Sequence, residues 1–225
     1  MSMPPLITGL YPYVRGGVHK PPVVTLAEIP RSLRVNPMYK DRLMVLAGNE
    51  ESAHSLKGFG LQVTRTFDDA PVFVTKDMAH KMKHWMCLWA LREFGEFLWL
   101  DWDTVWMRDP PAAFWKNLRA SATPRFIYIP HYWAIVNCGI YYVPGSWLGA
   151  MEKSLYFDTD DPNDELLWAS VLPCDVRQRR EFWWGQHALH IETLQDMESV
   201  TQKTYFAHVK NFDWFFDFKS GEKLI

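Results

Sequence analysis

The stretch from Phe97 to Pro110 reads FLWLDWDTVWMRDP and decides the predicted fold. Its first four residues are apolar, which is typical of a strand that is buried on both faces in a parallel sheet. The run stops at Asp101, and Asp103 follows two positions later, so an extended chain directs both carboxylates to one face. Ligands of open α/β sheets bind outside the carboxyl ends of the strands, where this pair falls. A divalent cation held by the carboxylates and by substrate phosphates would offset their mutual repulsion.

An Asp-x-Asp pair also has a plain structural interpretation, because aspartates after a strand often form a turn or cap a helix. The flanking residues favour the metal site. The segment resembles the strand end of the GT-A nucleotide-sugar glycosyltransferases, and the resemblance extends to Val105, Trp106 and the Asp109–Pro110 turn. It implies that Asp101 and Asp103 bind Mn²⁺ or Mg²⁺, and that this cation bridges the diphosphate of the donor. Asp101 is thereby also a candidate donor-binding residue.

Apolar runs alternate with helical patterns along much of the chain. We expect strands at 6–11, 42–47 and 61–66, and helices at 50–57 and 77–94. This alternation predicts an α/β fold with a mainly parallel central sheet flanked by helices. The resemblance implies the GT-A, Rossmann-like form of that fold, and the length fits a single domain that spans residues 1–225. The proline-rich stretch 20–40 is expected to be a loop-like connection with short helical pieces, among which one helix at most is expected.

The composition excludes several classes of protein. The formal net charge is −2, so nothing indicates a nucleic-acid-binding patch or a polybasic membrane surface. The three cysteines are widely spaced and form no Cys-x-x-Cys pair, which argues against a disulfide framework or a structural zinc site. No signal-peptide pattern and no apolar stretch of membrane-spanning length is present. We therefore expect a cytoplasmic protein without a transmembrane segment and without a nucleic-acid partner.

Two segments upstream of the aspartates offer donor-binding residues. Tyr13 and Arg15 follow the first expected strand, in a turn that resembles the "YakGA" element of glycogenin-like transferases, whose tyrosine stacks on the uracil of the donor. An ordinary exposed loop is the alternative. The family often has a donor-binding basic residue in the helix before the Asp-x-Asp, which implies such a role for Lys83 or for Lys81. A solvated lysine face is the structural alternative for both.

The apolar run 134–143 contains Asn137 and Gly139. Such residues weaken a central strand, and close approach of a ligand to the backbone is a good reason for them. The run resembles the family's "fNsGvmv" element, in which the asparagine and the small residues line the pocket for the donor sugar. The resemblance therefore implies that Asn137 and Gly139 bind the donor. A strand bulge without a function is the alternative.

The acidic segment 158–165 contains a second Asp-x-Asp. No buried strand delivers this segment to the edge of a sheet, so we interpret it as a solvated loop. In this loop Asp161 is expected to cap a helix, with Pro162 as its first residue.

Residues 181–190 read EFWWGQHALH and contain the candidate catalytic residues. The segment resembles the family's "DQdxlN" element, whose glutamine faces the reacting anomeric carbon. Gln186 matches that glutamine, although Gly185 stands where the family has aspartate. Glu181 is a competing candidate, either as an acid in the pocket or as a general base. Trp183 and Trp184 are expected to form a platform for the acceptor, with packing in the core as the alternative.

The strand expected at 204–211 contains a third candidate metal ligand. Imidazole suits manganese as carboxylate does, so His208 would complete the site begun by the two aspartates. The segment resembles the family's "HxxGxxKPW" element, which implies that His208 binds the metal. Lys210 is a candidate contact for the diphosphate, although it follows the histidine more closely than the family's lysine does. The alternative for His208 is a buried, hydrogen-bonded core residue.

These observations predict a metal-dependent glycosyltransferase. We expect it to move a hexosyl or related sugar from a nucleoside diphosphate sugar, with UDP favoured, to a hydroxyl acceptor such as a glycan. Two alternatives stay open: a nucleotidyltransferase of related fold, and a non-catalytic sugar-binding relic. A nucleotidyltransferase usually has a glycine-rich basic loop after its first strand, and residues 13–17 are a poor version of such a loop.

Overall fold

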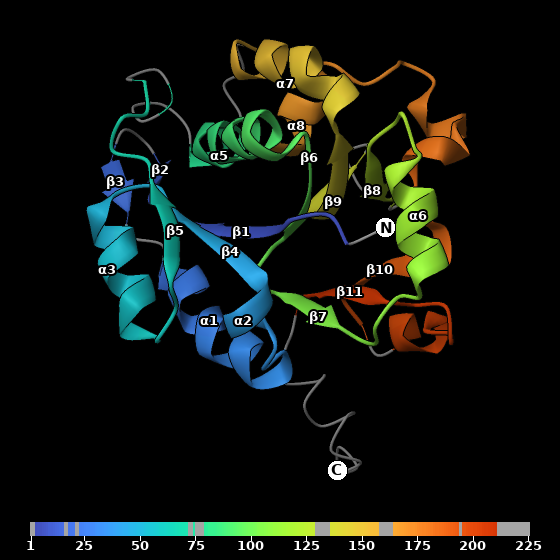
Figure 1. The fold of residues 1–225 in the computed structure, drawn as a ribbon, viewed down its shortest axis with the longest axis horizontal. Coiled ribbons are helices and arrows are strands. Elements are labelled where there is room, and N and C mark those ends of the chain that lie inside the picture. Colours follow the sequence, from blue (N-terminus) through green and yellow to red (C-terminus); the bar gives the residue numbers. More distant parts are fainter. Residues whose placement is uncertain are drawn as a thin grey trace.

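A six-stranded sheet in the order β5-β4-β1-β6-β9-β8 forms the centre of the protein (Figure 1). The computed structural model describes residues 3–15, 18–20, 23–71, 74, 79–128, 136–157, 164–193 and 195–210, without the side chains of 13–15, 18–20, 23–25, 79 and 80. The strands are β1 (Leu6–Leu10), β4 (Leu43–Ala47), β5 (Val63–Thr66), β6 (Glu96–Leu100), β8 (Arg125–Ile127) and β9 (Asn137–Pro144). The neighbouring strands β5, β4, β1 and β6 are mutually parallel, whereas β9 pairs antiparallel with both β6 and β8. The predicted mainly parallel α/β sheet is therefore confirmed.

Helices cover both faces of this sheet (Figure 1). One face packs against α5 (Ala79–Phe94), α7 (Leu148–Leu155) and α8 (Asp164–Ala169), and the other against α1 (Val23–Val35), α2 (Tyr39–Arg42), α3 (Glu50–Gly58) and α6 (Ala112–Arg119). Along β6, Phe97 and Trp99 enter the first apolar layer, while Leu98 and Leu100 enter the second. All four side chains are fully buried, as the continuous apolar run predicted.

A second sheet of three strands lies at the end of β6 (Figure 1). Its order is β10-β11-β7, with β7 at Thr104–Trp106, β10 at Ala188–Ile191 and β11 at Phe206–Val209. Only residues 101–103 connect β6 to β7, and the Thr104 amide donates to the Asp101 carbonyl at 3.0 Å within this turn. The Asp-x-Asp pair is therefore the corner at which the chain passes from the large sheet into the small one.

The proline-rich stretch differs from the expectation of a loop-like connection. Helix α1 runs through it for 13 residues, with Pro30 in its interior. A proline there removes a backbone hydrogen bond and disfavours the helix. The packing of Ile29, which is fully buried, offsets this cost. Tertiary contacts thus stabilise a helix that the local sequence does not favour.

The other elements are short. A hairpin of β2 (Tyr13–Arg15) and β3 (Val18–Lys20) follows β1. Turns of 3₁₀ helix are found at η1 (Gly145–Trp147), η2 (Val176–Gln178), η3 (Arg180–Phe182), η4 (Gly185–His187) and η5 (Gln195–Ser199). In the described part of the chain, no helix combines the length and the apolar character that a membrane crossing requires.

Candidate functional site

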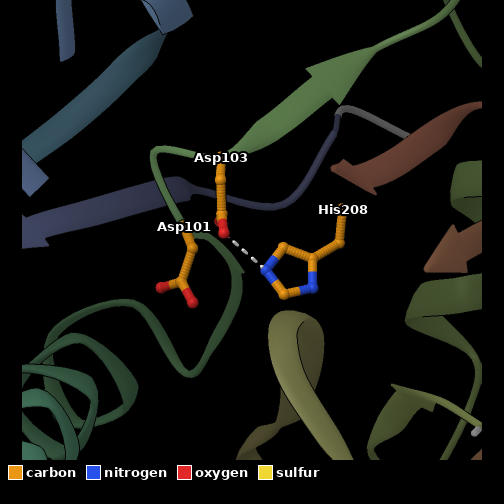
Figure 2. Close-up of side chains that lie close together, drawn as sticks. All are labelled: Asp101, Asp103 and His208. Atoms are coloured by element: carbon orange, nitrogen blue, oxygen red, sulfur yellow. Dashed lines mark hydrogen bonds and ion pairs between the residues drawn. The ribbon is translucent and has the colours of Figure 1, made fainter. Parts of the chain in front are cut away.

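Asp101, Asp103 and His208 converge where β6, β7 and β11 meet (Figure 2). One potential ligand atom from each residue lies within 4.8 Å of the other two. The Nε2 atom of His208 is 2.9 Å from the Oδ2 atom of Asp103, and the carboxylate of Asp101 lies beside this pair. Two carboxylates and one imidazole suit a divalent cation such as Mn²⁺. These three residues could therefore hold the metal that the sequence predicted.

Backbone pairing brings His208 to the aspartates. His208 lies opposite Thr104 in the β11–β7 ladder, and the Val209 amide donates to the Asp103 carbonyl at 2.8 Å. Gly139 of β9 leaves the space for the imidazole, because a Cβ atom at this glycine would lie 2.6 Å from carbon atoms of the ring. A close approach to the backbone does explain the glycine inside this strand, but the approaching group is the imidazole of a candidate metal ligand.

A second histidine holds the ring of His208. The Nδ1 atoms of His190 and His208 are 2.9 Å apart, so one ring donates a hydrogen bond to the other. Glu192 places a carboxylate oxygen 2.9 Å from the Nε2 atom of His190. This arrangement leaves the Nε2 atom of His208 facing Asp103. Metal-binding histidines usually have such a partner on their second nitrogen, because it fixes the orientation and the tautomer of the ring.

Lys83 of α5 is a buried ammonium between two carboxylates. Its Nζ atom lies 3.0 Å from Asp101 and 2.8 Å from Asp164, and it donates to the Cys138 carbonyl at 2.8 Å. Burial lowers the pKa of Lys83, but the two carboxylates outweigh burial and raise this pKa well above its ordinary value. Of the two lysines that the sequence left open, Lys83 is therefore the one at the site. Lys81 is partly exposed and does not line it.

The two aspartates of the pair differ in their electrostatics. Burial raises the pKa of Asp101, and Lys83 only partly offsets this effect. Burial acts to raise the pKa of Asp103 as well. The charge and the hydrogen bond of His208 outweigh burial and lower this pKa below its ordinary value. The Asp103 carboxylate is thus kept ionised beside the imidazole.

A polar cavity of about 210 Å³ opens beside the three candidate metal ligands. Its lining consists of Tyr11, Lys83, Asp101, Asn137, Cys138, Gly139, Asp164, Glu165, His208 and Lys210. Six of the residues that the sequence predicted for the metal and the donor are therefore brought together here. Lys210 is among them, with its Nζ atom 3.6 Å from Asp103 and 45% of its side chain exposed. Asn137 is buried, and its Oδ1 atom accepts from the Gly139 amide at 3.0 Å.

Two solved structures resemble most of the chain. One is a glycosyltransferase involved in the glycosylation of the major capsid of PBCV-1, with a TM-score of 0.52, 13% identity and coverage of 91% of this chain and 93% of that one. The other is mouse xyloside xylosyltransferase 1 in its apo form, with a TM-score of 0.50, 12% identity and coverage of 92% and 98%. The chain has a glycosyltransferase fold. No family model and no curated protein matches its sequence.

In this glycosyltransferase fold, two acidic residues that the sequence analysis missed line the cavity. Asp164 and Glu165 lie in α8, in the helix that was expected after Asp161, but they are only 7% and 6% exposed, so the expectation that they are solvated is wrong. Asp161 and Pro162 lie outside the described residues. Burial, together with the charge of Asp164, raises the pKa of Glu165 to about 8. The available signal was the apolar run that follows the pair, because a buried helix carries its first residues into the interior.

Glu28 of α1 was also missed, because it lies in the stretch that was expected to be a loop. Its carboxyl group is partly buried. Burial, followed by the charges of Asp103 and Asp101, raises the pKa of Glu28 to about 7. Its proton is thus held by the same negative potential that would attract a cation to the aspartates.

The candidate catalytic and acceptor residues of segment 181–190 lie elsewhere. Gln186 is exposed on η4, and Glu181 is exposed and paired with Arg179 at 2.7 Å. Neither residue lines the cavity beside the aspartates. Trp183 and Trp184 line a second cavity of about 570 Å³, and Trp184 is buried against the core.

The last candidates belong to the segment after β1. Tyr13 and Arg15 form the ends of β2, and their side chains lie outside the description. Tyr11, two residues earlier, lines the polar cavity. Burial raises the pKa of its hydroxyl group, so Tyr11 stays neutral and can both donate and accept hydrogen bonds.

Proposed function

We propose that this protein is a metal-dependent glycosyltransferase that moves a sugar from a nucleoside diphosphate sugar, with UDP favoured, to a hydroxyl group of a glycan. One observation carries the proposal: two carboxylates and an imidazole converge within 4.8 Å at the edge of a polar cavity. They do so at the carboxyl end of β6, where α/β sheets bind ligands. The fold shared with two glycosyltransferases supports the same function.

Asp101, Asp103 and His208 would hold Mn²⁺ or Mg²⁺. The donor set fits such an ion, because hard oxygen ligands suit both metals and a single imidazole is compatible with manganese. The bound cation would supply positive charge that stabilises the departing diphosphate. A hydrogen bond donated by the Nδ1–H group of His208 to His190 would keep the Nε2 atom of His208 available for the ion.

The two lysines of the cavity have different roles in this proposal. Lys210 lies at the end of β11 next to Asp103, with an exposed ammonium that would bind the diphosphate of the donor. Lys83 is enclosed by Asp101, Asp164 and the Cys138 carbonyl. Lys83 would therefore act on the donor mainly by neutralising these two carboxylates and fixing them in the wall of the cavity.

The sugar of the donor would lie against Asn137, Asp164 and Glu165. Asn137 places its Nδ2 atom 3.4 Å from Glu165, so the two side chains form a polar wall that can bind hydroxyl groups. Asp164, which is paired with Lys83 at 2.8 Å, would face the reacting carbon. Glu165, with its raised pKa, would donate a hydrogen bond. This assignment gives Asp164 and Glu165 the part that the sequence analysis predicted for Gln186 and Glu181.

A donor-hydrolysis screen tests the proposal. The protein is incubated with Mn²⁺ and a panel of nucleoside diphosphate sugars, and release of the nucleoside diphosphate is measured. We expect hydrolysis of at least one donor, a loss of about 100-fold or more in Asp101→Asn, and no loss in Asp175→Asn, which changes an exposed aspartate. Equal activity of the two variants, or hydrolysis that persists in EDTA, would overturn the metal site.

The same assay separates the two sets of candidate catalytic residues. Asp164→Asn is expected to lower the rate strongly, whereas Gln186→Ala is expected to keep most of it, because Gln186 does not line the cavity. The opposite result would restore the prediction that was made from the sequence. Circular dichroism and thermal unfolding of both variants show whether each has kept its fold.

A further inference from the structure

A second cavity, separate from the proposed transfer site, has a volume of about 570 Å³. It lies between α6, the start of β8 and residues 180–187, and it shares no lining residue with the polar cavity beside the aspartates. Strand β9 contributes to both cavities. Its Gly139 lines the polar cavity. The carbonyl of the next residue, Ile140, accepts a hydrogen bond at 3.1 Å from Trp184, which lines the second cavity. A cavity of this size is within the range of pockets that bind small molecules.

Aromatic rings with fixed positions form much of the wall. The indole N–H of Trp183 donates to the Val176 carbonyl at 3.1 Å, and that of Trp184 donates to Ile140. Phe114 of α6 stacks on Trp184 with ring centroids 6.2 Å apart and an interplanar angle of 17°. Rings that are held in this way lose little conformational entropy when a ligand binds. Flat, rigid aromatic surfaces also suit the apolar faces of sugar rings.

The charge in this cavity is positive. Arg125 and Arg180 line it, and no carboxylate does so among the described residues. Among the described residues, Arg125 donates to neutral groups, namely the carbonyls of Arg180 and Trp183 and the hydroxyl of Ser121. Burial lowers the pKa of the Arg125 guanidinium group, and the charge of Glu181 offsets this effect only in part. The nearby Glu181 is paired with Arg179 at 2.7 Å and does not line the cavity.

Arg180 extends the positive charge to the mouth of the cavity. Its side chain is exposed, and within the described part of the chain it makes no hydrogen bond or ion pair. His187 adds a further polar group. Its Nδ1 atom donates to the Lys203 carbonyl at 3.0 Å, which leaves the Nε2 atom of the neutral ring as an acceptor for a hydroxyl group.

We infer that this cavity is an accessory binding site for an anionic saccharide, that is, a sugar unit with a carboxylate or a phosphate group. The rings provide stacking surfaces, the two guanidinium groups bind the anion, and His187 can accept from a hydroxyl group. A polyanion such as nucleic acid fits less well, because the chain has a net charge of −2 and the positive charge is concentrated in one cavity. If the protein transfers sugar to a glycan as proposed, the anionic saccharide would be a distal part of that acceptor. This assignment rests on the proposed function, whereas the binding of an anionic saccharide does not.

Calorimetry in EDTA tests this inference without metal-dependent donor binding. The probes are hyaluronan tetrasaccharide for carboxylated sugars, glucose 6-phosphate for phosphorylated sugars, maltotetraose as a neutral saccharide, and a short oligothymidylate. We expect at least one of the two anionic saccharides to bind at least about tenfold more tightly than maltotetraose and the oligothymidylate. The comparison of the two anionic saccharides identifies the anion.

Two arginine variants locate the binding. Arg180→Gln is expected to weaken the binding of the anionic saccharide by about tenfold or more, because the substitution removes a charged side chain that has no structural role. Arg177→Gln changes an exposed arginine that does not line the cavity, and it should bind as the wild type does. Equal binding of neutral and anionic saccharides, tighter binding of the oligothymidylate, no binding of any probe, or an unchanged Arg180→Gln variant would overturn the inference. If the donor-hydrolysis screen fails but these results hold, the proposed function falls and the accessory site remains.

Discussion

Gly139 and His208 are in direct contact across two sheets, with no room between them for one more carbon atom. A Cβ atom at residue 139 would lie 2.6 Å from three carbon atoms of the imidazole. Because β9 belongs to the central sheet and β11 to the small one, this contact fixes the distance between the sheets at the candidate metal site. The geometry of the metal ligands therefore depends on a glycine that is not itself a candidate metal ligand.

Gly139→Ala is expected to push the imidazole away from Asp103. We predict that it lowers the free energy of unfolding by about 1–3 kcal/mol, as overpacking does, and that it weakens Mn²⁺ binding. Gly149→Ala is the matched control, because nothing lies within 4 Å of its added methyl group in α7. Alanine has a higher helix propensity than glycine, so this control substitution should leave stability unchanged or increase it. Urea unfolding and calorimetry with Mn²⁺ measure both effects, and similar results for the two variants would contradict the steric account.

His190→Ala is expected to release the ring of His208. The imidazole loses the partner at its Nδ1 atom, so we predict a 10- to 100-fold weaker affinity for Mn²⁺ with little change in the far-ultraviolet circular dichroism. The control is His54→Ala, which changes an exposed histidine on α3. Calorimetry gives the affinities directly. An unchanged affinity in His190→Ala would show that the second histidine does not position the first.

Lys83→Met is expected to leave the carboxylates of Asp101 and Asp164 buried without their shared cation. Removal of one partner from a buried ion pair typically costs about 3–5 kcal/mol, and we predict a loss of stability of this size. The same substitution at the partly exposed Lys81 should change stability by less than about 0.5 kcal/mol. The difference is read from urea unfolding at neutral pH. A Lys83→Met variant as stable as Lys81→Met would mean that the two carboxylates do not depend on this ammonium.

The strands at the centre of the fold could be predicted because each is a short, mainly apolar run. The strands β1, β4 and β6 lie within a residue or two of their expected positions. Elements that depend on distant partners could not be predicted. Helix α1 overcomes an internal proline through packing, and β10 exists because it pairs with β11. Neither partner is visible in the local sequence.

The residues of the candidate site also differ in whether the local sequence is enough to predict them. Asp101, Asp103 and His208 come together as the sequence predicted, because a strand end and a chemically suitable histidine can both be recognised locally. Asp164 and Glu165 were interpreted as solvated because no buried strand delivers their segment to the edge of a sheet. Their burial depends on Lys83 and Asn137, which lie on other elements. Charged residues are buried only when partners satisfy them, and such partners are apparent only in the folded protein.

Glu165 is expected to make stability depend on pH. Its pKa is raised from 4.5 to about 8 in the folded protein, so folding favours the protonated carboxyl group. This contribution is fully present below about pH 4.5 and is lost as the pH rises through 8. Glutamine does not ionise, so the stability of Glu165→Gln relative to the wild type should increase over this range. Unfolding free energies measured in EDTA across the range test this, and a constant difference between the two proteins would contradict it.

Binding of UDP with and without Mn²⁺ is the most direct test of whether Asp101 and Asp103 hold a cation for a nucleoside diphosphate. Calorimetry is performed on the wild type and on Asp103→Asn, each in Mn²⁺ and in EDTA. The account predicts that Mn²⁺ strengthens UDP binding to the wild type by at least about tenfold, and that Asp103→Asn abolishes this gain while its thermal unfolding stays cooperative. UDP affinity that is the same in Mn²⁺ and in EDTA, or a gain that persists in Asp103→Asn, would contradict the claim that these aspartates hold a cation for a nucleoside diphosphate.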